Sequence, residues 1–241
     1  MKVMTFNIQH CLDYKNNRIN ISLFSDTIKK YGADICGLNE VRGKGPLLGY
    51  SDQTRALGDS LKFNSYFAEA IKVKGKSPYG NALVTRYEII SCVTIPVPDP
   101  TDKSDKGSFE TRCILNALLN VDNQKLRVLV CHMGLEASER VNAVKIICNL
   151  LDEITDPVIL MGDFNSTPDD TVYAPLYDRL SDADVLSVNK GMATYPSYAP
   201  DKKIDYIFYR GLKCKDVETI CEIISDHYPI IAEFEFLKNT D

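Results

Sequence analysis

The sequence predicts a mixed α/β (α+β) fold in which two packed β-sheets are flanked by helices. Short β-rich runs outnumber helical runs and several follow one another directly, which favours mixed or antiparallel sheets over a strictly alternating parallel fold. The chain has 241 residues, 44% hydrophobic and 25% charged, as in typical soluble globular proteins. A chain of this length can bury a large core, so we expect residues 1–241 to form a single domain.

Ten runs have the pattern of strands, because β-branched and other apolar residues dominate them and turn residues separate them. In chain order they are 2–8, 33–41, 65–71, 81–86, 89–97, 112–121, 126–132, 158–163, 204–209 and 230–236. Helical spacing predicts three helices, over 21–31, 53–62 and 136–154. The last of these places Val141, Val144, Ile147, Cys148 and Leu151 on one face, so we expect it to cover a sheet.

Two stretches are predicted to be loops. The polar, proline-rich segment 96–108 is too short and too central to link two domains, and it is interpreted as a surface loop between strands. Gly75-Lys76-Ser77 imitates the end of a phosphate-binding loop, but Pro78 blocks the helix that such a loop requires. It is better interpreted as a hairpin loop.

Charge and cysteine content narrow the class of protein. Lys plus Arg is 28 and Asp plus Glu is 33, and the net charge of −5 argues against a broad footprint on duplex DNA. The eight cysteines lack the close spacing of a structural zinc site and are predicted to be free thiols. Neither a signal peptide nor an apolar run of the ~18 residues that span a bilayer is visible, so we expect a cytoplasmic protein without a membrane partner.

The most informative segment is Gly162-Asp163-Phe164-Asn165, which follows an apolar strand. A strand that ends in this way delivers the carboxylate of Asp163 and the amide of Asn165 to the rim of the sheet, where they suit water and metal chemistry. An isolated Asp-x-Asn also fits an Asx-turn that caps the next segment.

A second candidate pairing joins Asp205 to the segment Ser225-Asp226-His227. Asp205 interrupts an apolar strand, and a buried aspartate needs a partner, for which His227 is the favoured candidate. Asp226 and His227 are sequence neighbours and should point in different directions, so we expect separate roles for them. The alternatives are an Asp205 that faces solvent from an edge strand and a simple turn at 225–229.

Three further polar residues end apolar strands. Glu40 is a hard oxygen ligand suited to Mg²⁺ or Mn²⁺, and Asn7 can orient it or contact phosphate. His132 also ends a strand, where a hydrogen-bonded structural histidine is the alternative interpretation. Serine-hydrolase chemistry is disfavoured for two reasons. The motif Gly-x-Ser-x-Gly is absent, and Ser225, Asp226 and His227 are consecutive in the sequence, so they cannot form a catalytic triad.

Together these segments resemble the endonuclease/exonuclease/phosphatase family, the DNase-I-like metal-dependent phosphohydrolases. The matching segments are Thr-Phe-Asn-Ile at 5–8, Leu-Asn-Glu-Val at 38–41, Tyr-Gly-Asn-Ala-Leu-Val-Thr-Arg at 79–86, Glu-Thr-Arg at 110–112, Cys-His-Met-Gly-Leu at 131–135, Gly-Asp-Phe-Asn at 162–165, Ile-Asp-Tyr-Ile at 204–207 and Ser-Asp-His at 225–227. Each motif is weak, but the ordered set is specific and covers nearly the whole chain. The resemblance implies a four-layered sandwich with the site at one rim.

The resemblance also implies roles for the candidate residues. Glu40 would be the principal Mg²⁺ (or Mn²⁺) ligand, supported by Asn7 and Asp226. Asp163 would position and deprotonate the attacking water, and Asn165 would orient Asp163 or the phosphate. The remaining candidates would act on the phosphate: the Asp205–His227 pair and His132, with Arg112 and Asn81 as weaker candidates.

Two departures limit the resemblance. The family often has Leu-Gln-Glu where this chain has Leu38-Asn39-Glu40. The extra glutamate that pairs with the equivalent of His132 in DNase-I-like nucleases is not found, which weakens a general-base role for His132.

The expected partner is a phosphate-ester substrate, either a small phosphodiester or a nucleic-acid end, and no obligate protein partner is evident. The segments 42–50 and 194–198 are predicted to shape the pocket, with tyrosines such as Tyr195 stacking on a base or sugar and Lys44 or Arg42 holding a second phosphate. The alternative is that both segments are ordinary loops. The alternatives are a nuclease acting on single-stranded or damaged nucleic acid, and a non-catalytic protein that binds a phosphate ligand on the same fold.

Overall fold

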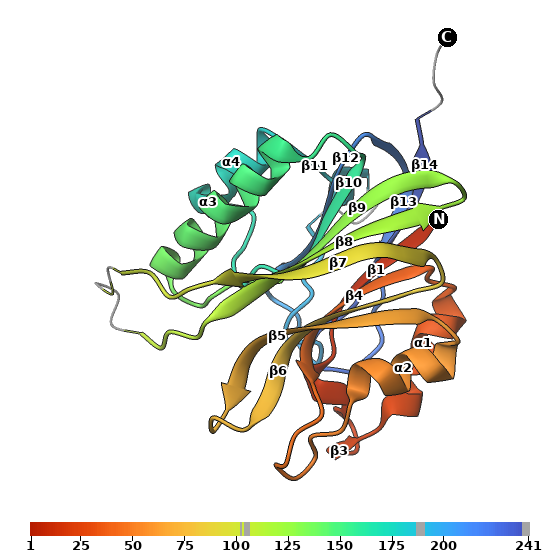
Figure 1. Ribbon diagram of the computed structural model, residues 1–241, viewed down its shortest axis with the longest axis vertical. Coiled ribbons are helices and arrows are strands. Elements are labelled where there is room, and N and C mark those ends of the chain that lie inside the picture. The colour runs from red at the N-terminus through yellow and green to blue at the C-terminus, as the bar shows by residue number, and fades with distance from the viewer. Residues whose placement is uncertain (102, 104–106, 187–190, 238–241) are drawn as a thin grey trace.

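The computed structural model describes residues 1–101, 103, 107–186 and 191–237. Two six-stranded sheets pack face to face, and helices cover the outer side of each sheet (Figure 1). The strand order is β13-β14-β1-β4-β6-β5 in sheet 1 and β11-β12-β10-β9-β8-β7 in sheet 2. The expected four-layered arrangement of two mixed sheets between helices is confirmed.

The elements have the following bounds. Sheet 1 contains β1 (Lys2–Asn7), β4 (Ile35–Arg42), β5 (Asn64–Val73), β6 (Ser77–Thr85), β13 (Leu212–Thr219) and β14 (Ile230–Phe236). Sheet 2 contains β7 (Glu88–Val97), β8 (Arg112–Val121), β9 (Gln124–His132), β10 (Val158–Asp163), β11 (Ser181–Asp182) and β12 (Asp205–Arg210). The helices are α1 (Ile21–Tyr31), α2 (Gln53–Leu61), α3 (Ala137–Glu153) and α4 (Ala174–Tyr177), and β2 (Leu12–Asp13) pairs with β3 (Arg18–Ile19).

Helix ends follow local sequence signals. The side chain of Asn20 accepts the backbone N–H of Leu23 at the start of α1, and Gly32 ends that helix at φ 66°. Glu136 and Glu139 form a reciprocal capping box at the start of α3. These caps satisfy backbone groups that the helix itself leaves unpaired.

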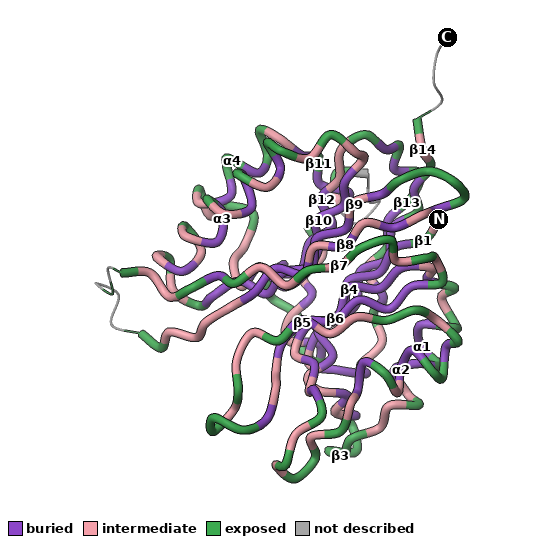
Figure 2. The backbone as a smooth tube through the Cα atoms, viewed as in Figure 1, coloured by how far each residue is buried: buried purple, intermediate pink, exposed green. Residues whose placement is uncertain are grey.

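Three separate apolar cores hold the four layers together. One lies between the sheets and includes Val3, Leu83 and Val130. A second lies between sheet 2 and α3, and a third joins sheet 1 to α1 and α2. Central strands are consequently buried on both faces, as the purple tubes in Figure 2 show. Such strands appear in the sequence as continuous apolar runs.

The layer between the sheets changes from apolar to polar at one end of the molecule. Because side chains alternate along a strand, the residues of β10 that face sheet 1 are Ile159, Met161 and finally Asp163. The same alternation carries β9 from Val128 and Val130 to His132. β1 and β4 are parallel neighbours, as are β9 and β10, so four carboxyl ends of strands meet at this edge. The candidate site residues lie there.

All ten predicted strands and all three predicted helices are present, with small differences at their ends. β13 was missed by the sequence pattern, because a bulge between Cys214 and Asp216 interrupts its alternation of buried and exposed residues. All eight cysteines are free thiols, as predicted. Residues 74–76 turn between β5 and β6, which confirms the hairpin loop.

Two expectations concern loops and membranes. Residues 96 and 97 of the predicted loop 96–108 belong to β7 instead, and the rest of it lies between β7 and β8, with residues 102 and 104–106 outside the described residues. Among the described residues, no helix is both long and apolar enough to cross a bilayer.

Candidate active site

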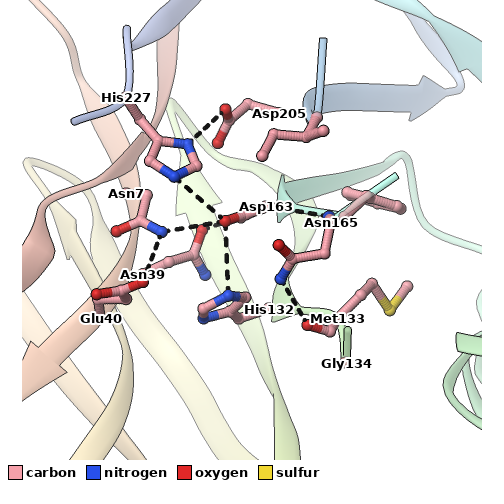
Figure 3. Close-up of polar contacts among 12 residues, drawn as sticks. Asn7, Asn39, Glu40, His132, Met133, Gly134, Asp163, Asn165, Asp205 and His227 are labelled. Carbon is pink, nitrogen blue, oxygen red and sulfur yellow. Dashed lines mark hydrogen bonds and ion pairs between the residues drawn. The ribbon is translucent and has the colours of Figure 1, made fainter. Parts of the chain in front are cut away.

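Three reactive side chains stand in one row across sheet 2. The strand register pairs Asp163, at the end of β10, with His132 on β9 and with Asp205 on β12. His227 completes the group: its Nδ1 lies 2.9 Å from Asp205 Oδ2, and its Nε2 lies 3.7 Å from Asp163 Oδ2 (Figure 3). His132 Nε2 lies 3.5 Å from the same oxygen of Asp163. The predicted Asp205–His227 pair is confirmed, and Asp205 is buried rather than solvent-facing.

The two histidines carry different charges although both are buried. Burial lowers the pKa of His227, but the charges of Asp205 and Asp163 outweigh burial and raise it to about 10. Burial, helped by the positive charges of Arg112 and His227, holds the pKa of His132 well below its usual range. His227 is therefore an imidazolium at neutral pH, and His132 is neutral.

Asp163 sits between these histidines with an unusual proton affinity. Burial raises its pKa to about 7, against the opposing charge of His227. A carboxylate with this pKa can accept a proton near neutral pH more readily than an ordinary aspartate. Its other oxygen accepts the backbone N–H of Asn165 at 2.9 Å, so the Asx-turn considered for this motif is also present.

Gly162 allows this row to form. Its φ is +146°, and a Cβ at this position would fall 1.8 Å from the carbonyl oxygen of Cys131. The glycine therefore lets the end of β10 approach β9 closely, next to Asp163 and His132.

Sheet 1 contributes Glu40 from an irregular point in β4. The pairing of β4 with β6 shifts register between Leu38 and Val41, and Glu40 adopts a left-handed backbone at φ 59°. Its carboxylate accepts the Tyr79 hydroxyl at 2.8 Å and the Asn7 amide at 3.1 Å. The same Asn7 nitrogen donates to Asp163 Oδ2 at 3.0 Å, so Asn7 joins Glu40 to Asp163 (Figure 3).

Asp226 lines the same cavity as Glu40. It accepts the Gln9 side-chain amide at 3.1 Å and the Ser225 hydroxyl at 3.0 Å. Burial raises the pKa of Asp226, and the negative charge of Glu40 raises it further. Two carboxylates thus face the same region and repel each other.

This arrangement fits a divalent cation. Glu40 and Asp226 offer hard oxygen atoms, and a cation between them would relieve their repulsion. The side-chain oxygen of Gln9, the residue that holds Asp226, is buried without a hydrogen-bond partner. Asn7 turns its amide nitrogen toward Glu40 and Asp163, and its oxygen accepts the backbone N–H of Gln9, which suits an orienting role better than direct ligation.

Asp163, Asp205 and His227 also form a compact set of candidate metal ligands, since their ligand atoms lie within 4.8 Å of one another. His227, however, carries a proton that balances the charge of these aspartates. The oxygen-rich pair of Glu40 and Asp226 therefore suits a cation better.

Behind these residues, a buried amide links the two sheets. Asn39 accepts the backbone N–H of Asp163 at 3.0 Å and donates to the carbonyl of Cys131 at 2.8 Å. It also donates to Asn81 at 2.8 Å, and Asn81 donates to the carbonyl of Cys113 at 3.0 Å. Asn39 is fully buried, so its bonds fix the ends of β9 and β10 relative to Glu40.

These groups surround a cavity of about 440 Å³. Its lining residues are Glu40, Tyr79, Glu110, Arg112, His132, Leu135, Asp163, Asn165, Tyr195, Lys202, Ile204, Asp226 and His227. Arg112 is held between two of its neighbours: its Nη1 lies 2.7 Å from Glu110 and 3.4 Å from His132 Nδ1.

Most of the predicted site residues meet at this cavity, and the rest lie beside or behind it. Asn81 is 2% exposed and both ends of its amide bond protein groups, so it supports the link between the sheets instead of reaching phosphate. Asn165 lines the cavity but donates its side-chain amide to the carbonyl of Met133. Of the predicted pocket segments, Tyr195 lines the cavity, whereas Lys44 is not among the lining residues.

The sequence did not single out three residues that matter here. Tyr79 and Glu110 lie within segments that carried the resemblance, which was the available signal for them. Lys202 belongs to no recognisable sequence motif, and it reaches the cavity because its loop pairs with Tyr195.

A four-layered sandwich with this rim of carboxylates, amides and histidines is the architecture of the DNase-I-like phosphohydrolases that the sequence resembles. The chain belongs to the Endonuclease/Exonuclease/phosphatase family, whose profile matches residues 4–227.

Relatives with similar sequences match either a part of this chain or nearly all of it. A UPF0294 protein of Vibrio cholerae is 33% identical over 92 residues, which are 37% of this chain and 32% of that protein. The chain therefore spans about a third of the length of the first such relatives. The uncharacterized protein YbhP of Escherichia coli is 25% identical over 250 residues, covering 96% of this chain and 95% of YbhP.

Solved structures share the fold. A family member from Leptotrichia buccalis superposes with a TM-score of 0.79 at 24% identity, covering 98% of this chain and 100% of that one. A mannosyl-6-phosphatase of Bacteroides thetaiotaomicron gives a TM-score of 0.76 at 17% identity, with the same coverage. At these identities the likeness establishes the fold alone.

Proposed function

We propose that this protein is a Mg²⁺- or Mn²⁺-dependent phosphodiesterase. The observation that carries the proposal is the convergence of Asp163, with its raised pKa, and the Glu40–Asp226 pair at one cavity. Phosphoester hydrolysis needs an oriented water, a group to accept its proton and charge to stabilise the phosphoryl oxygens. The cavity offers candidates for each requirement.

Glu40 and Asp226 would hold the metal ion, with Asn7 and Tyr79 fixing the Glu40 carboxylate. When bound, the ion would supply positive charge to the phosphate oxygens. Gln9 would keep Asp226 oriented toward it.

Asp163 would orient the attacking water and accept its proton. Asn7 and the imidazolium of His227 both face the Asp163 oxygen, so they limit the directions in which this carboxylate can point. Asp205 holds His227 in place through Nδ1 at 2.9 Å, which leaves Nε2 directed toward Asp163 and the cavity. The positive charge of His227 would stabilise the negative charge that develops on the phosphoryl group.

His132 and Arg112 would contact the non-bridging phosphate oxygens. The neutral His132 donates without adding charge, and Glu110 offsets the charge of Arg112 at 2.7 Å. Four acidic side chains line the same cavity, namely Glu40, Glu110, Asp163 and Asp226. Arg112, Lys202 and the imidazolium of His227 line it too, so with a divalent ion bound the lining charges would come close to balancing the single negative charge of a phosphodiester, and less well the two charges of a monoester.

The test is metal-dependent hydrolysis by the wild type and by Asp163→Asn, with a panel of phosphomonoesters, small phosphodiesters, single-stranded and abasic oligonucleotides and phospholipids. We expect diesterase activity with Mg²⁺ or Mn²⁺, loss with EDTA, and a fall in kcat of about 10²–10⁴-fold in the variant. Asp26→Asn is the matched control, because the Asp26 side chain on α1 is 72% exposed.

Other outcomes would revise the proposal. Preference for oligonucleotides would make the protein a nuclease, and preference for monoesters would exclude the diesterase. Mg²⁺ binding without turnover of any substrate would indicate a non-catalytic phosphate-binding protein.

A further inference from the structure

A short loop beside the cavity carries three side chains suited to ligand binding. It runs from residue 194 to 202 and closes on itself: the backbone N–H groups of Tyr195 and Lys202 each donate to the other residue's carbonyl at 3.0 Å. This pairing places Tyr195 and Lys202 together in the cavity wall. Tyr198 occupies the tip of the loop and is 64% exposed.

The loop is anchored to the segment that carries Asp226. The backbone N–H of Ser197 donates to the Asp226 carbonyl at 2.7 Å, and the Ser197 hydroxyl donates to the Ser225 carbonyl at 2.6 Å. Tyr14, from the opposite end of the chain, binds the same segment through its backbone N–H and the Ile224 carbonyl at 3.0 Å. Tyr14 and Tyr198 are thus fixed next to a proposed metal ligand.

The two rings stack on each other. Their centroids lie 6.4 Å apart with an interplanar angle of 11°, so Tyr14 supports Tyr198 while leaving most of Tyr198 accessible. Tyr195 packs against the catalytic group from the same loop, with its ring 4.8 Å from the ring of His227. An aromatic surface therefore extends from the proposed reaction centre to the exposed Tyr198.

A large exposed aromatic ring that is already held by a neighbour loses little freedom when a third ring stacks on it. Planar nucleobases use such surfaces in a sequence-tolerant way. Lys202, in the adjoining cavity wall, places a positive charge where an attached phosphate would lie. In a protein of net charge −5 this local lysine counts more than general electrostatic attraction.

We propose that the Tyr14–Tyr198 pair is a stacking platform for a planar base, and that the substrate is a nucleoside phosphodiester whose phosphate lies in the cavity. This inference rests on the proposed function for the phosphate end of the substrate, and adds the chemical class of the other end.

The experiment compares ligands that differ only in the base. The ligands are the methyl diesters of the four nucleoside 5′-monophosphates and of ribose 5-phosphate, and their binding to the full chain is measured by calorimetry with Mg²⁺, in the Asp163→Asn background so that they are not hydrolysed. At least one nucleotide diester should bind about tenfold more tightly than the ribose 5-phosphate diester. Tyr198→Ala should remove this preference and leave binding of the ribose 5-phosphate diester unchanged, while Tyr198→Phe should keep it. Tyr177→Ala is the control, because Tyr177 is 40% exposed on α4, away from the loop.

Equal binding of all five ligands, absence of binding by any of them, or a preference that survives in Tyr198→Ala would overturn the inference. Its failure is separable from failure of the proposed function. Metal-dependent hydrolysis without a base preference would contradict the stacking platform and support the proposed phosphodiesterase. A base preference without hydrolysis would support the stacking platform and contradict the phosphodiesterase.

Discussion

Sheet 1 and sheet 2 bring different chemistry to the same cavity. Glu40 of sheet 1 raises the pKa of the nearby Asp226 by charge repulsion, and under the proposed function a divalent cation would offset this repulsion. Beside sheet 2 the positive charge comes from the chain itself, because His227, from the segment that precedes β14 of sheet 1, lies between Asp205 and Asp163. Under the proposed function, the metal side of the cavity, formed by Glu40 and Asp226, lies apart from its proton side, formed by Asp163, Asp205 and His227.

Neutral amides connect the two sides. Asn7 bonds Glu40 and Asp163, and Asn39 bonds the backbone of β9 and β10 from β4. An amide can fix the distance between two charged groups without changing their charges. Asn7 and Asn39 therefore connect the two sheets without adding charge to the cavity.

The largest effect should come from removing the positive charge of His227. In His227→Gln, Asp205 and Asp163 lose the charge between them, and we expect a loss of about 3–5 kcal/mol in the free energy of unfolding. The double variant His227→Gln/Asp205→Asn should recover much of this stability without recovering hydrolysis. Denaturant unfolding and single-turnover kinetics measure the two quantities. Equal stability of the single variant and the wild type would contradict a charged His227 between Asp205 and Asp163.

Breaking the link between the sheets should have the next largest effect. Asn39→Leu leaves the Asp163 N–H and the Cys131 carbonyl without their partner, at a cost of about 3 kcal/mol of stability. Hydrolysis should fall through kcat while Mg²⁺ affinity changes little, because Glu40 keeps its own contacts. Asn149→Leu, at an exposed position of α3, is the control. A variant with unchanged stability and kcat would show that the link is dispensable.

Changing the proposed metal ligand Glu40 should lower the Mg²⁺ affinity and should cost less stability than the two preceding variants. Glu40→Gln removes a carboxylate and its repulsion of Asp226, so the metal-free variant should be at least as stable as the wild type. Its Mg²⁺ affinity should fall by about 100-fold. Calorimetric titration and the Mg²⁺-induced rise in Tm report this, with Glu69→Gln on β5 as the matched variant. A variant that still binds Mg²⁺ tightly would place the metal elsewhere.

The smallest effect concerns the neutral His132. Its pKa is depressed in the folded protein, so below pH 6.5 the unfolded chain binds a proton that the folded chain does not, and stability falls as the pH falls. Between pH 6.5 and 5.5 this contribution is about 1 kcal/mol. Asp163, with its pKa raised to about 7, titrates in the opposite sense. The quantity to measure is therefore the difference in stability between the wild type and His132→Gln, and a difference independent of pH would show that folding does not shift the pKa of His132.

The strand ends and their polar residues were predictable, because the alternation of inward and outward side chains along a strand depends only on neighbouring residues in the sequence. Counting in steps of two from buried neighbours places Asp163 and His132 on the inner faces, and the cost of burying Asp205 alone pointed to His227. The Tyr79–Glu40 and Asn39–Cys131 bonds were not predictable, since they depend on a bulge and on how two sheets align. The role of Asn39 could not be inferred from a pattern that only marked it as a departure from the family.

The position of β1 has a consequence for how the protein is made. β1 lies between β4 and β14, so the first strand of the chain gains its second neighbour only after the last strand has been synthesised. A nascent chain that ends before residue 225 would contain Glu40 and Asp163 but neither Asp226 nor His227. It would also expose an unpaired edge of β1, which is a hazard for aggregation. Assembly of the reactive centre therefore coincides with completion of the sheet, and an incomplete chain should remain inert.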